Sequence, residues 1–303
     1  MRNFLITLLI FILMCSCDNN DVSSPDNEVL SGTGSFSYSG YAPLRESPVR
    51  VYYFIPDGDV TQMPVLFVLH GASRNGADYR DAWTATTKAY KAIIVAPEFS
   101  DNFYPGGSSY NLGNVFINGN RPSASTLNPR DQWTFSILEP LFDEIKLRTG
   151  NRADTYDIYG HSAGAQFAHR FVMFEPEARA ARVIAASSGW YTVPDREVHF
   201  PYGIAESPVS LISPHDYFSR ALILQIGEND NNPDSAGLRH HTELDAQQGT
   251  NRYERALYFF RISDRIATGL GSPFAWKLDI VPGAGHDFRQ AIPSAARILY
   301  GDR

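Results

Sequence analysis

The stretch that decides the fold is Tyr156-Asp157-Ile158-Tyr159-Gly160-His161-Ser162-Ala163-Gly164. Its first half alternates as a short strand does and runs directly into the pattern G-x-S-x-G, behind which residues 166–172 are typical of a helix. In such a strand–turn–helix the serine stands at a tight apex, and the flanking glycines let the strand and the helix approach closely. The helix N-terminus would direct backbone N–H groups at an anion forming beside Ser162. A glycine-rich loop before an ordinary helix is the alternative.

Strand and helix patterns alternate on both sides of this stretch. Two segments are typical of an antiparallel pair of strands, 34–41 and 49–55. Further strands, largely apolar as in a parallel sheet buried on both faces, are expected at 64–70, 92–97, 182–188, 220–226 and 276–281. Helices are expected at 77–90, 133–147, 251–268 and 288–299. The alternation predicts a mostly parallel, doubly wound α/β sheet of about eight strands flanked by helices.

The chain shows no internal repeat and no linker beyond its N-terminal region, so we expect a single domain over residues 34–303. Two long connections interrupt the alternation, at 98–130 and 191–219. Both are punctuated by proline, and the first is also rich in Gly, Asn and Ser. Loops of this length tend to line binding sites. We therefore expect both connections to roof the site and to select the substrate.

Composition narrows the class of protein. Of the 303 residues, 43% are hydrophobic and 19% are charged, as in a globular protein and unlike a disordered or membrane-embedded one. The formal net charge is −7 and the chain carries no basic run, so nucleic acid is not an expected partner.

The N-terminus has the layout of a secretory signal. An uninterrupted apolar run over 4–14 follows one arginine and is too short to span a bilayer. The only two cysteines, Cys15 and Cys17, close this run. The segment resembles a bacterial lipoprotein signal, which implies a signal peptide over 1–16 and lipidation of Cys17. Met14 stands where leucine is preferred, so Cys15 is a second candidate, and a plain cleaved signal is a further alternative.

A polar segment separates this signal from the domain. Residues 17–33 are rich in Asn, Asp, Ser and Pro and are expected to form a flexible tether. Signal and tether together predict an exported protein, lipid-anchored to a bacterial cell-envelope membrane on its periplasmic or surface face. If Cys17 carries the lipid, the domain has no thiol for a disulfide or for thiolate chemistry.

Reactive or polar groups follow four of the expected strands. They are His70-Gly71-Ala72, Ser162, Asp230 and His286. In a doubly wound sheet such groups gather at the carboxyl ends of the strands. With serine, aspartate and histidine in this chain order, the sequence resembles the α/β-hydrolases. The His-Gly-Ala-Ser turn and the Gly-His-Ser-Ala-Gly elbow are similar to those of secreted esterases of the polyhydroxybutyrate-depolymerase and feruloyl-esterase kinds.

The resemblance implies a role for each group. Ser162 would be the nucleophile, activated when His286 takes its proton. Asp230 would hold the other ring N–H of His286 and stabilise the imidazolium. The backbone N–H groups of Ala72 and Ala163 would form the oxyanion hole. This chemistry requires neither a metal nor an organic cofactor.

Other polar residues either compete with Asp230 for its role or are not expected to take part in the reaction. Glu228 and Asp234 are rivals of Asp230 because they occupy the same loop. His161, inside the elbow, is expected to be packed structure and not a second base. A metal site at His240-His241 and Glu243 is not expected, because adjacent histidines on a strand point to opposite faces and the helical spacing of zinc ligands is absent.

Aromatic residues near the strand ends are candidate walls of the substrate pocket. Trp190 and Tyr191 follow the strand expected at 182–188, and Tyr104 and Trp133 lie in or beside the first long connection. Each is equally compatible with core packing.

The function expected from these observations is that of a serine esterase. It would form an acyl-enzyme, and its substrates would be esters of a polymer or carbohydrate outside the cytoplasm. The same triad also suits a peptidase or amidase. A third possibility, of another class, is a catalytically dead surface lipoprotein that binds a polymer.

Overall fold

The computed structural model describes residues 29–211 and 213–301. The expected lipidation residue Cys17, its rival Cys15 and the signal peptide therefore lie outside the described residues. The folded part begins earlier than the expected boundary at residue 34. Leu30 is buried, and its N–H donates to the carbonyl of Arg148 at 2.9 Å. The last residues assigned to the tether thus belong to the domain.

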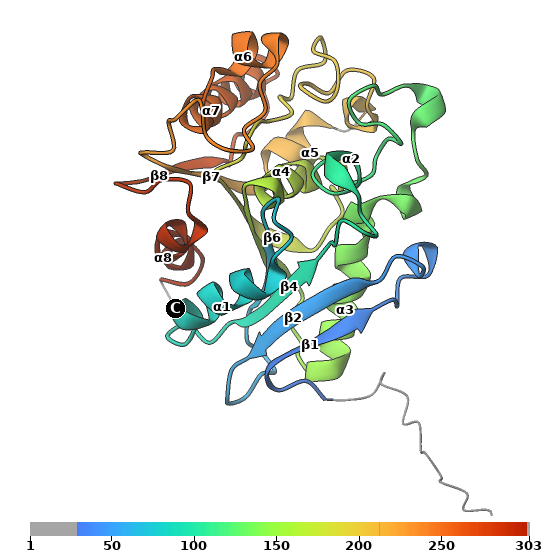
Figure 1. Ribbon diagram of the computed structural model, residues 1–303, viewed down its shortest axis with the longest axis vertical. Coiled ribbons are helices and arrows are strands. Elements are labelled where there is room, and N and C mark those ends of the chain that lie inside the picture. Colours follow the sequence, from blue (N-terminus) through green and yellow to red (C-terminus); the bar gives the residue numbers. More distant parts are fainter. Residues whose placement is uncertain (1–28, 212, 302–303) are drawn as a thin grey trace, which may run out of the picture.

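Eight strands form one sheet, as the sequence predicts (Figure 1). Their order across the sheet is β1-β2-β4-β3-β5-β6-β7-β8. β1 is antiparallel to β2 and β2 to β4, whereas all the other pairs are parallel. The strands are β1 Gly32–Tyr38, β2 Val49–Ile55, β3 Val65–Leu69, β4 Ile93–Glu98, β5 Tyr156–His161, β6 Ala180–Ala186, β7 Ala221–Gly227 and β8 Lys277–Val281.

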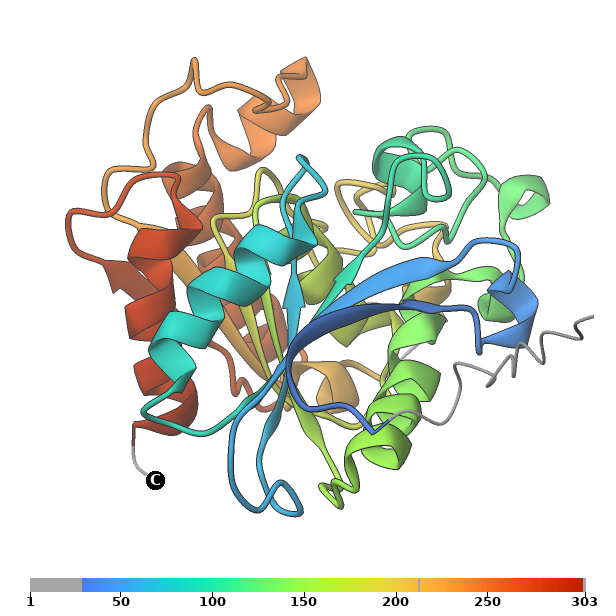
Figure 2. The same ribbon diagram turned by 60° about the horizontal axis from the view of Figure 1, so that its bottom comes forward.

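Helices cover both faces of the sheet. α1 and α8 pack together on one face (Figure 2), and α3, α4 and α7 pack on the other. The α-helices are α1 Gly76–Thr87, α2 Gly106–Ser109, α3 Leu138–Thr149, α4 Ala163–Phe174, α5 Pro214–Phe218, α6 Thr242–Gln248, α7 Arg252–Gly269 and α8 Phe288–Tyr300. Short 3-10 helices span Ala42–Leu44, Ala124–Thr126, Arg130–Gln132, Thr134–Ile137 and Pro208–Leu211.

The expected helix at 133–147 differs in its beginning. Trp133 has extended backbone angles, a 3-10 turn follows, and α3 starts only at Leu138. It ends as expected, because Gly150 adopts a left-handed φ of 74° that terminates the helix. The short helices α2, α5 and α6 were not expected, since four to seven residues carry no readable helical period.

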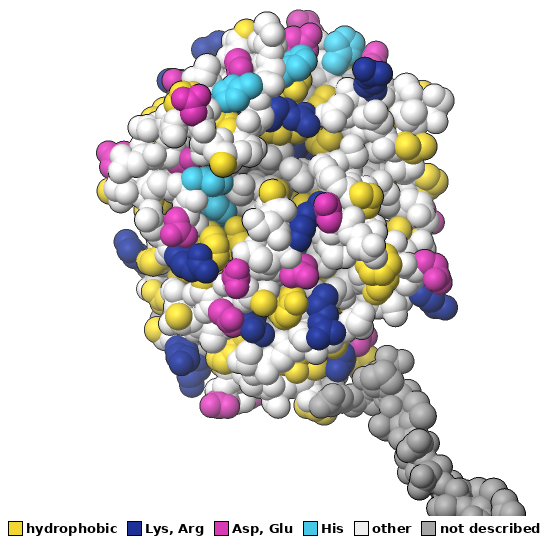
Figure 3. All heavy atoms as spheres, viewed as in Figure 1, with side chains coloured by type: hydrophobic (Ala, Val, Ile, Leu, Met, Phe, Trp, Pro, Cys, Tyr) yellow, Lys and Arg dark blue, Asp and Glu magenta, His cyan; other side chains and the backbone are white. Residues whose placement is uncertain are grey.

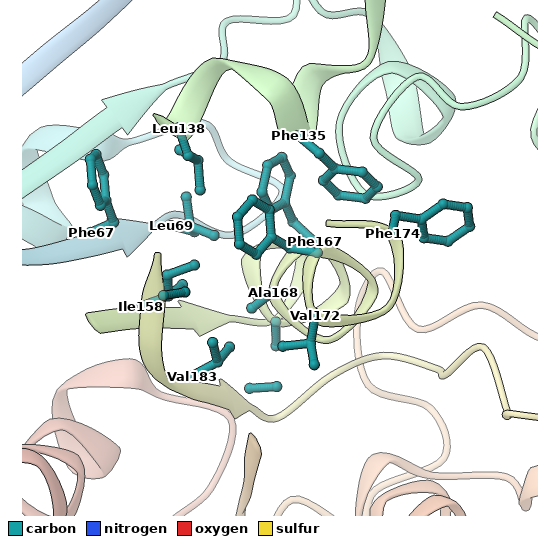
Figure 4. Close-up of a cluster of buried hydrophobic side chains, with 14 of the residues drawn as sticks. Phe67, Leu69, Phe135, Leu138, Ile158, Phe167, Ala168, Val172, Phe174 and Val183 are labelled. Carbon is teal, nitrogen blue, oxygen red and sulfur yellow. The ribbon is translucent and has the colours of Figure 1, made fainter. Parts of the chain in front are cut away.

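The core explains why the central strands are apolar throughout. Every residue of β3 is fully buried, with alternate side chains on the two faces of the sheet. On one face, α4 lays Phe167, Ala168 and Val172 over strands β3, β5 and β6 (Figure 4). Burying one such large side chain contributes about 1.5–3 kcal/mol. This packing fixes the helix that follows Ser162.

The first long connection leaves the carboxyl end of β4 and the second leaves that of β6, and the second returns through α5 to the amino end of β7. In Figure 1, α2 and α5, which belong to these connections, stand in the upper half of the molecule, as does α6 from the segment between β7 and α7. No helix among the described residues is both long and apolar enough to cross a membrane.

Candidate active site

The turn between β5 and α4 holds Ser162 in a strained conformation. Its φ is 55° and its ψ is −112°, in a region that L-residues rarely adopt. The two glycines of the motif are sterically required. A Cβ at Gly160 would overlap the carbonyl of Gly164, and one at Gly164 would overlap the carbonyl of Leu69. The Ser162 N–H donates to the carbonyl of Ala186 at 2.9 Å, which fixes the turn to β6.

The loops that carry Asp230 and His286 are joined to each other by their backbones. The Asn229 N–H donates to the carbonyl of Ala284 at 2.8 Å. A Cβ at Gly227, the last residue of β7, would overlap the same Ala284 carbonyl. The position of Asp230 relative to His286 is therefore set by backbone contacts between the two loops.

Ser162, His286 and Asp230 form a continuous chain of hydrogen bonds. His286 Nδ1 lies 2.8 Å from Asp230 Oδ2, and His286 Nε2 lies 3.2 Å from Ser162 Oγ. A carboxylate only accepts, so Nδ1 carries the proton and Nε2 is free to accept the one on Ser162. Asp230 is 3% exposed, and water scarcely competes for it. The structure brings together the three side chains that the sequence singled out.

The rival acids are placed elsewhere. Glu228 Oε2 accepts the N–H of Gly283 at 2.9 Å, on the outer side of the loop. Asp234 is exposed, and its backbone N–H donates to the Asn232 side chain.

One neighbour of the site was missed in the sequence. Arg252 Nη1 lies 3.5 Å from Asp230 Oδ1 and 2.7 Å from the hydroxyl of Ser235, and both Arg252 and Asp230 are buried. Asn251 caps the N-terminus of α7 and so places Arg252 in its first turn. The cap could have been read from the sequence, but the contact with a loop 22 residues earlier could not.

His70 orients the loop that contains Ala72. The Phe99 N–H donates to His70 Nε2 at 3.0 Å, so the other ring nitrogen, 2.8 Å from the Gly71 carbonyl, is the donor. Burial lowers the pKa of His70 to about 3, which keeps the ring neutral in this tautomer. In a trans peptide the C=O and the next N–H point in opposite directions. The Ala72 N–H is therefore directed away from His70.

Ala72 and Ala163 are the residues whose N–H groups were expected to form the oxyanion hole. Gly71 lies against the nucleophile, since a Cβ there would be 3.6 Å from Ser162 Cβ. Ala72 lines the adjoining cavity, and Ala163 is the first residue of α4, whose N–H precedes the intrahelical ladder.

His161 is part of the packing, as expected. The Tyr79 hydroxyl lies 3.0 Å from His161 Nδ1, and Tyr79 stacks on Phe288 with 3.9 Å between ring centroids. Burial, and then the nearby His286, lowers the pKa of His161 well below its ordinary value. The His161 ring thus stays neutral. It packs against the His286 ring, with 4.8 Å between the ring centroids.

Two cavities meet beside the site. One, of about 400 Å³, is lined by Ala72, Gln166 and Trp190 among others. The other, of about 770 Å³, extends outward between the two long connections, and both cavities share Asn120 and Arg239 in their walls. Figure 3 shows histidine, Lys and Arg side chains around a hollow in the upper half of this face.

Of the aromatic candidates for the pocket, only Trp190 lines the cavity beside Ala72. Tyr191 is fully buried and stacks on Phe259, with 4.5 Å between the ring centroids. The Tyr104 ring packs edge-on against Phe99, away from the cavity. The expectation that Tyr191 and Tyr104 contact substrate is wrong.

Trp133 and the histidine pair also take structural positions. The Trp133 indole N–H donates to the carbonyl of Asn128, and its ring packs on Phe174. His240 lies between Asp245 and the carbonyl of Pro233, at 3.0 and 2.9 Å. Within 29–211 and 213–301, no cluster of three or more His, Cys, Asp or Glu residues is arranged to hold a metal ion.

Comparison with known proteins finds substantial likenesses among solved structures. A poly(aspartic acid) hydrolase from Sphingomonas sp. KT-1 is 35% identical, with a TM-score of 0.81 over 89% of this chain and 99% of its own. A poly(3-hydroxybutyrate) depolymerase from Bordetella parapertussis is 32% identical, with a TM-score of 0.81 over 90% of this chain and 91% of its own.

A more distant likeness concerns the fold alone. An S-formylglutathione hydrolase from Staphylococcus aureus is 13% identical, with a TM-score of 0.53 over 89% of this chain and 99% of its own. No protein-family model matches the sequence, and no curated protein matches it. The elbow, the strand order and the two relatives above 30% identity lead to one assignment. The chain belongs to the α/β-hydrolase family of serine esterases.

Proposed function

We propose that the protein hydrolyses carboxylic esters, with Ser162 as nucleophile, His286 as general base and Asp230 as the carboxylate that orients His286. The observation that carries this proposal is the chain of hydrogen bonds from Ser162 Oγ to Asp230 Oδ2, 3.2 and 2.8 Å long. Strain at Ser162 supports it, because strained residues held by rigid surroundings cluster at functional sites.

In the first half of the reaction, His286 Nε2 takes the hydroxyl proton as Ser162 Oγ attacks the ester carbonyl. The N–H groups of Ala72 and Ala163 stabilise the resulting oxyanion. The intermediate collapses, the C–O bond to the alcohol breaks, and His286 returns the proton to the leaving alcohol. Water then attacks the acyl-enzyme with the same proton transfers and releases the acid.

A polymeric or carbohydrate-linked ester is the substrate class that we propose. The two adjoining cavities, about 400 and 770 Å³, give room for a substrate that extends well beyond the scissile bond. The two relatives above 30% identity are named for the hydrolysis of polymers. A location outside the cytoplasm, with Cys17 lipidated, suits such a substrate. Incorporation of an alkynyl fatty acid that is lost in Cys17→Ala tests this location.

The catalytic proposal is tested with a series of p-nitrophenyl esters, acetate to long acyl chains plus a feruloyl ester, and with matched p-nitroanilides. We expect Ser162→Ala to lower kcat by at least about 10⁴-fold, because the nucleophile is lost. Labelling by a fluorophosphonate should disappear in the same variant. Ser125→Ala, on the exposed surface, serves as the control.

The outcomes separate the alternatives. Retention of esterase activity in Ser162→Ala would contradict the assignment of Ser162 as the nucleophile. Faster turnover of the anilides than of the esters would favour an amidase with the same triad. Absence of both turnover and labelling in the unaltered protein would favour a polymer-binding protein.

A further inference from the structure

Two arginines contact the same indole ring at the site. The guanidinium carbon of Arg170 lies 4.2 Å from the ring centroid of Trp190, and that of Arg239 lies 4.8 Å from it. Trp190 lines the cavity that also contains Ala72 and Gln166. Gln166 and Arg170 belong to α4, the helix that begins directly after Ser162. Two guanidinium groups thus contact the indole that lines the cavity next to Ala72.

Arg170 is buried without a carboxylate. Its guanidinium donates to the Thr192 hydroxyl at 2.8 Å and to the carbonyls of Asn111 and Gln166 at 3.1 and 2.9 Å. Among the described residues its Nη2 has no hydrogen-bond partner. Burial, and then the charge of Arg239, lowers the pKa of Arg170. A buried charge without a counter-ion is costly, so an arriving anion would be favoured here.

Arg239 is the accessible member of the pair. Its Nη1 donates to the side-chain oxygen of Asn120 at 2.8 Å, and within the described parts of the chain it forms no ion pair. It lines both cavities and is only partly buried. Its remaining N–H groups are therefore available to a ligand.

Arg74, the other arginine that lines the cavity, is already engaged. It pairs with Asp101 at 3.2 Å and donates to the carbonyls of Phe99, Tyr104 and Gly106. Asp101 is the only acidic residue among those that line this cavity, so Arg170 and Arg239 leave an excess of positive charge. The excess stands out in a chain whose net charge is −7.

We propose that Arg239, held on Trp190 in front of Arg170, binds a carboxylate of the substrate, so that the preferred ester carries a free carboxylate close to the scissile bond. Guanidinium groups bind carboxylates through paired N–H donors, which gives affinity and orientation. The outer cavity shares Arg239 and adds three glutamates and three histidines, which are Glu197, Glu206, Glu243, His199, His240 and His241. The excess of positive charge therefore lies in the inner cavity, next to Ala72, and suits one anionic group near the ester.

The inference rests on the proposed esterase activity, and two pairs of esters test it. One pair is p-nitrophenyl hexanoate and the p-nitrophenyl monoester of adipic acid, which places a carboxylate on the acyl side. The other is phenyl butyrate and 3-carboxyphenyl butyrate, which places it on the leaving side. We expect kcat/KM to favour the anionic member of at least one pair by about tenfold, as a charge-assisted contact would.

Variants locate the source of that preference. In Arg239→Gln the ratio of kcat/KM within the pair should fall towards one, mainly through KM, whereas Arg239→Lys should keep part of it. Arg45→Gln removes the same charge from an exposed position outside the cavity walls and should leave the ratio as it is.

Two results would overturn the inference while leaving the esterase proposal intact. One is an unaltered protein that hydrolyses the neutral esters but prefers neither anionic one. The other is an Arg239→Gln variant that keeps the preference of the unaltered protein. Absence of turnover on all four esters, together with absence of fluorophosphonate labelling, would instead overturn the esterase proposal and this inference with it.

Discussion

The frame around Ser162 consists of Gly160, Gly164 and the loops that carry Ala72, Asp230 and His286. The cleft above it consists of the two adjoining cavities. The two parts are built by different kinds of contact. In the frame the contacts are between backbone atoms. Gly164 packs closely against the backbone of β3, and the loop of Asp230 is hydrogen-bonded to the Ala284 carbonyl. In the cleft, side chains from distant segments meet at partly exposed positions, as where Arg239 contacts Asn120 across 119 residues. The frame leaves little room for variation, whereas the cleft can change residue by residue without disturbing Ser162. Chemistry and selectivity are thus separable in this fold.

The largest effect is expected from a substitution at one glycine of the frame. In Gly164→Ala the new Cβ would overlap the backbone carbonyls of Leu69 and His70, which cannot move aside. We expect esterase activity to fall below detection and the unfolding free energy to fall by about 3 kcal/mol. Thermal melting and turnover of p-nitrophenyl butyrate measure both.

Gly107→Ala is the matched change in the cleft wall. The nearest atom to its new Cβ is Asn111 Cγ at 3.9 Å, an ordinary contact. Stability and turnover should stay close to those of the unaltered protein. If the two alanine variants behaved alike, the distinction between a rigid frame and an adaptable cleft would be wrong.

A smaller effect is expected at the point where the frame orients an oxyanion donor. In His70→Leu the Gly71 carbonyl loses its ring donor and keeps the Arg74 N–H at 3.2 Å, so the Ala72 N–H is held less firmly. We expect kcat to fall by about 10²-fold with little change in KM, because the contact acts on the transition state. Steady-state kinetics on a short-chain ester measures this.

Tyr110→Phe is the control. The Tyr110 hydroxyl donates to the carbonyl of His70 at 2.8 Å and not to the Gly71 carbonyl. Its loss should cost about 1 kcal/mol of stability and change kcat far less. Equal losses of kcat in the two variants would show that general packing matters here and not the orientation of the Ala72 peptide.

The smallest expected effect concerns pH. Burial lowers the pKa of His70 to about 3 and also lowers those of His161 and His169. Below pH about 6.5 the unfolded chain takes up protons at these positions and the folded chain does not, so stability falls as pH falls. For His70 the loss between pH 6.5 and 5 is about 2 kcal/mol.

Urea unfolding at pH 7.5 and 5.0 checks this, and His70→Leu should show a smaller difference between the two pH values. The cleft histidine His240 behaves in the opposite way, because its hydrogen bond to Asp245 raises its pKa. Equal stability of the unaltered protein at the two pH values would contradict the idea of a frame that keeps its histidines neutral.

The frame was also the part that the sequence could predict. The strands of the sheet are predicted by apolar runs, and the turn at Ser162 is predicted by the two glycines that its close packing requires. Asp230 and His286 could be found because each follows one of these strands. Tyr104 and Tyr191 were misjudged because sequence distance from a strand end does not say which side of the chain a ring faces. Arg252 and Arg239 were overlooked because their partners are set by tertiary contacts across loops.

The junction between His70 and Phe99 has a consequence for anyone who would graft a new specificity onto this scaffold. The first long connection leaves β4 through Phe99 and Tyr110, and both donate hydrogen bonds to His70. Its opening residues therefore support the loop of Ala72, and several of them, such as Gly107 and Asn111, also line the cavity. A loop transplanted from a relative should therefore keep Phe99 and Tyr110, so that both hydrogen bonds to His70 survive while the residues around them change.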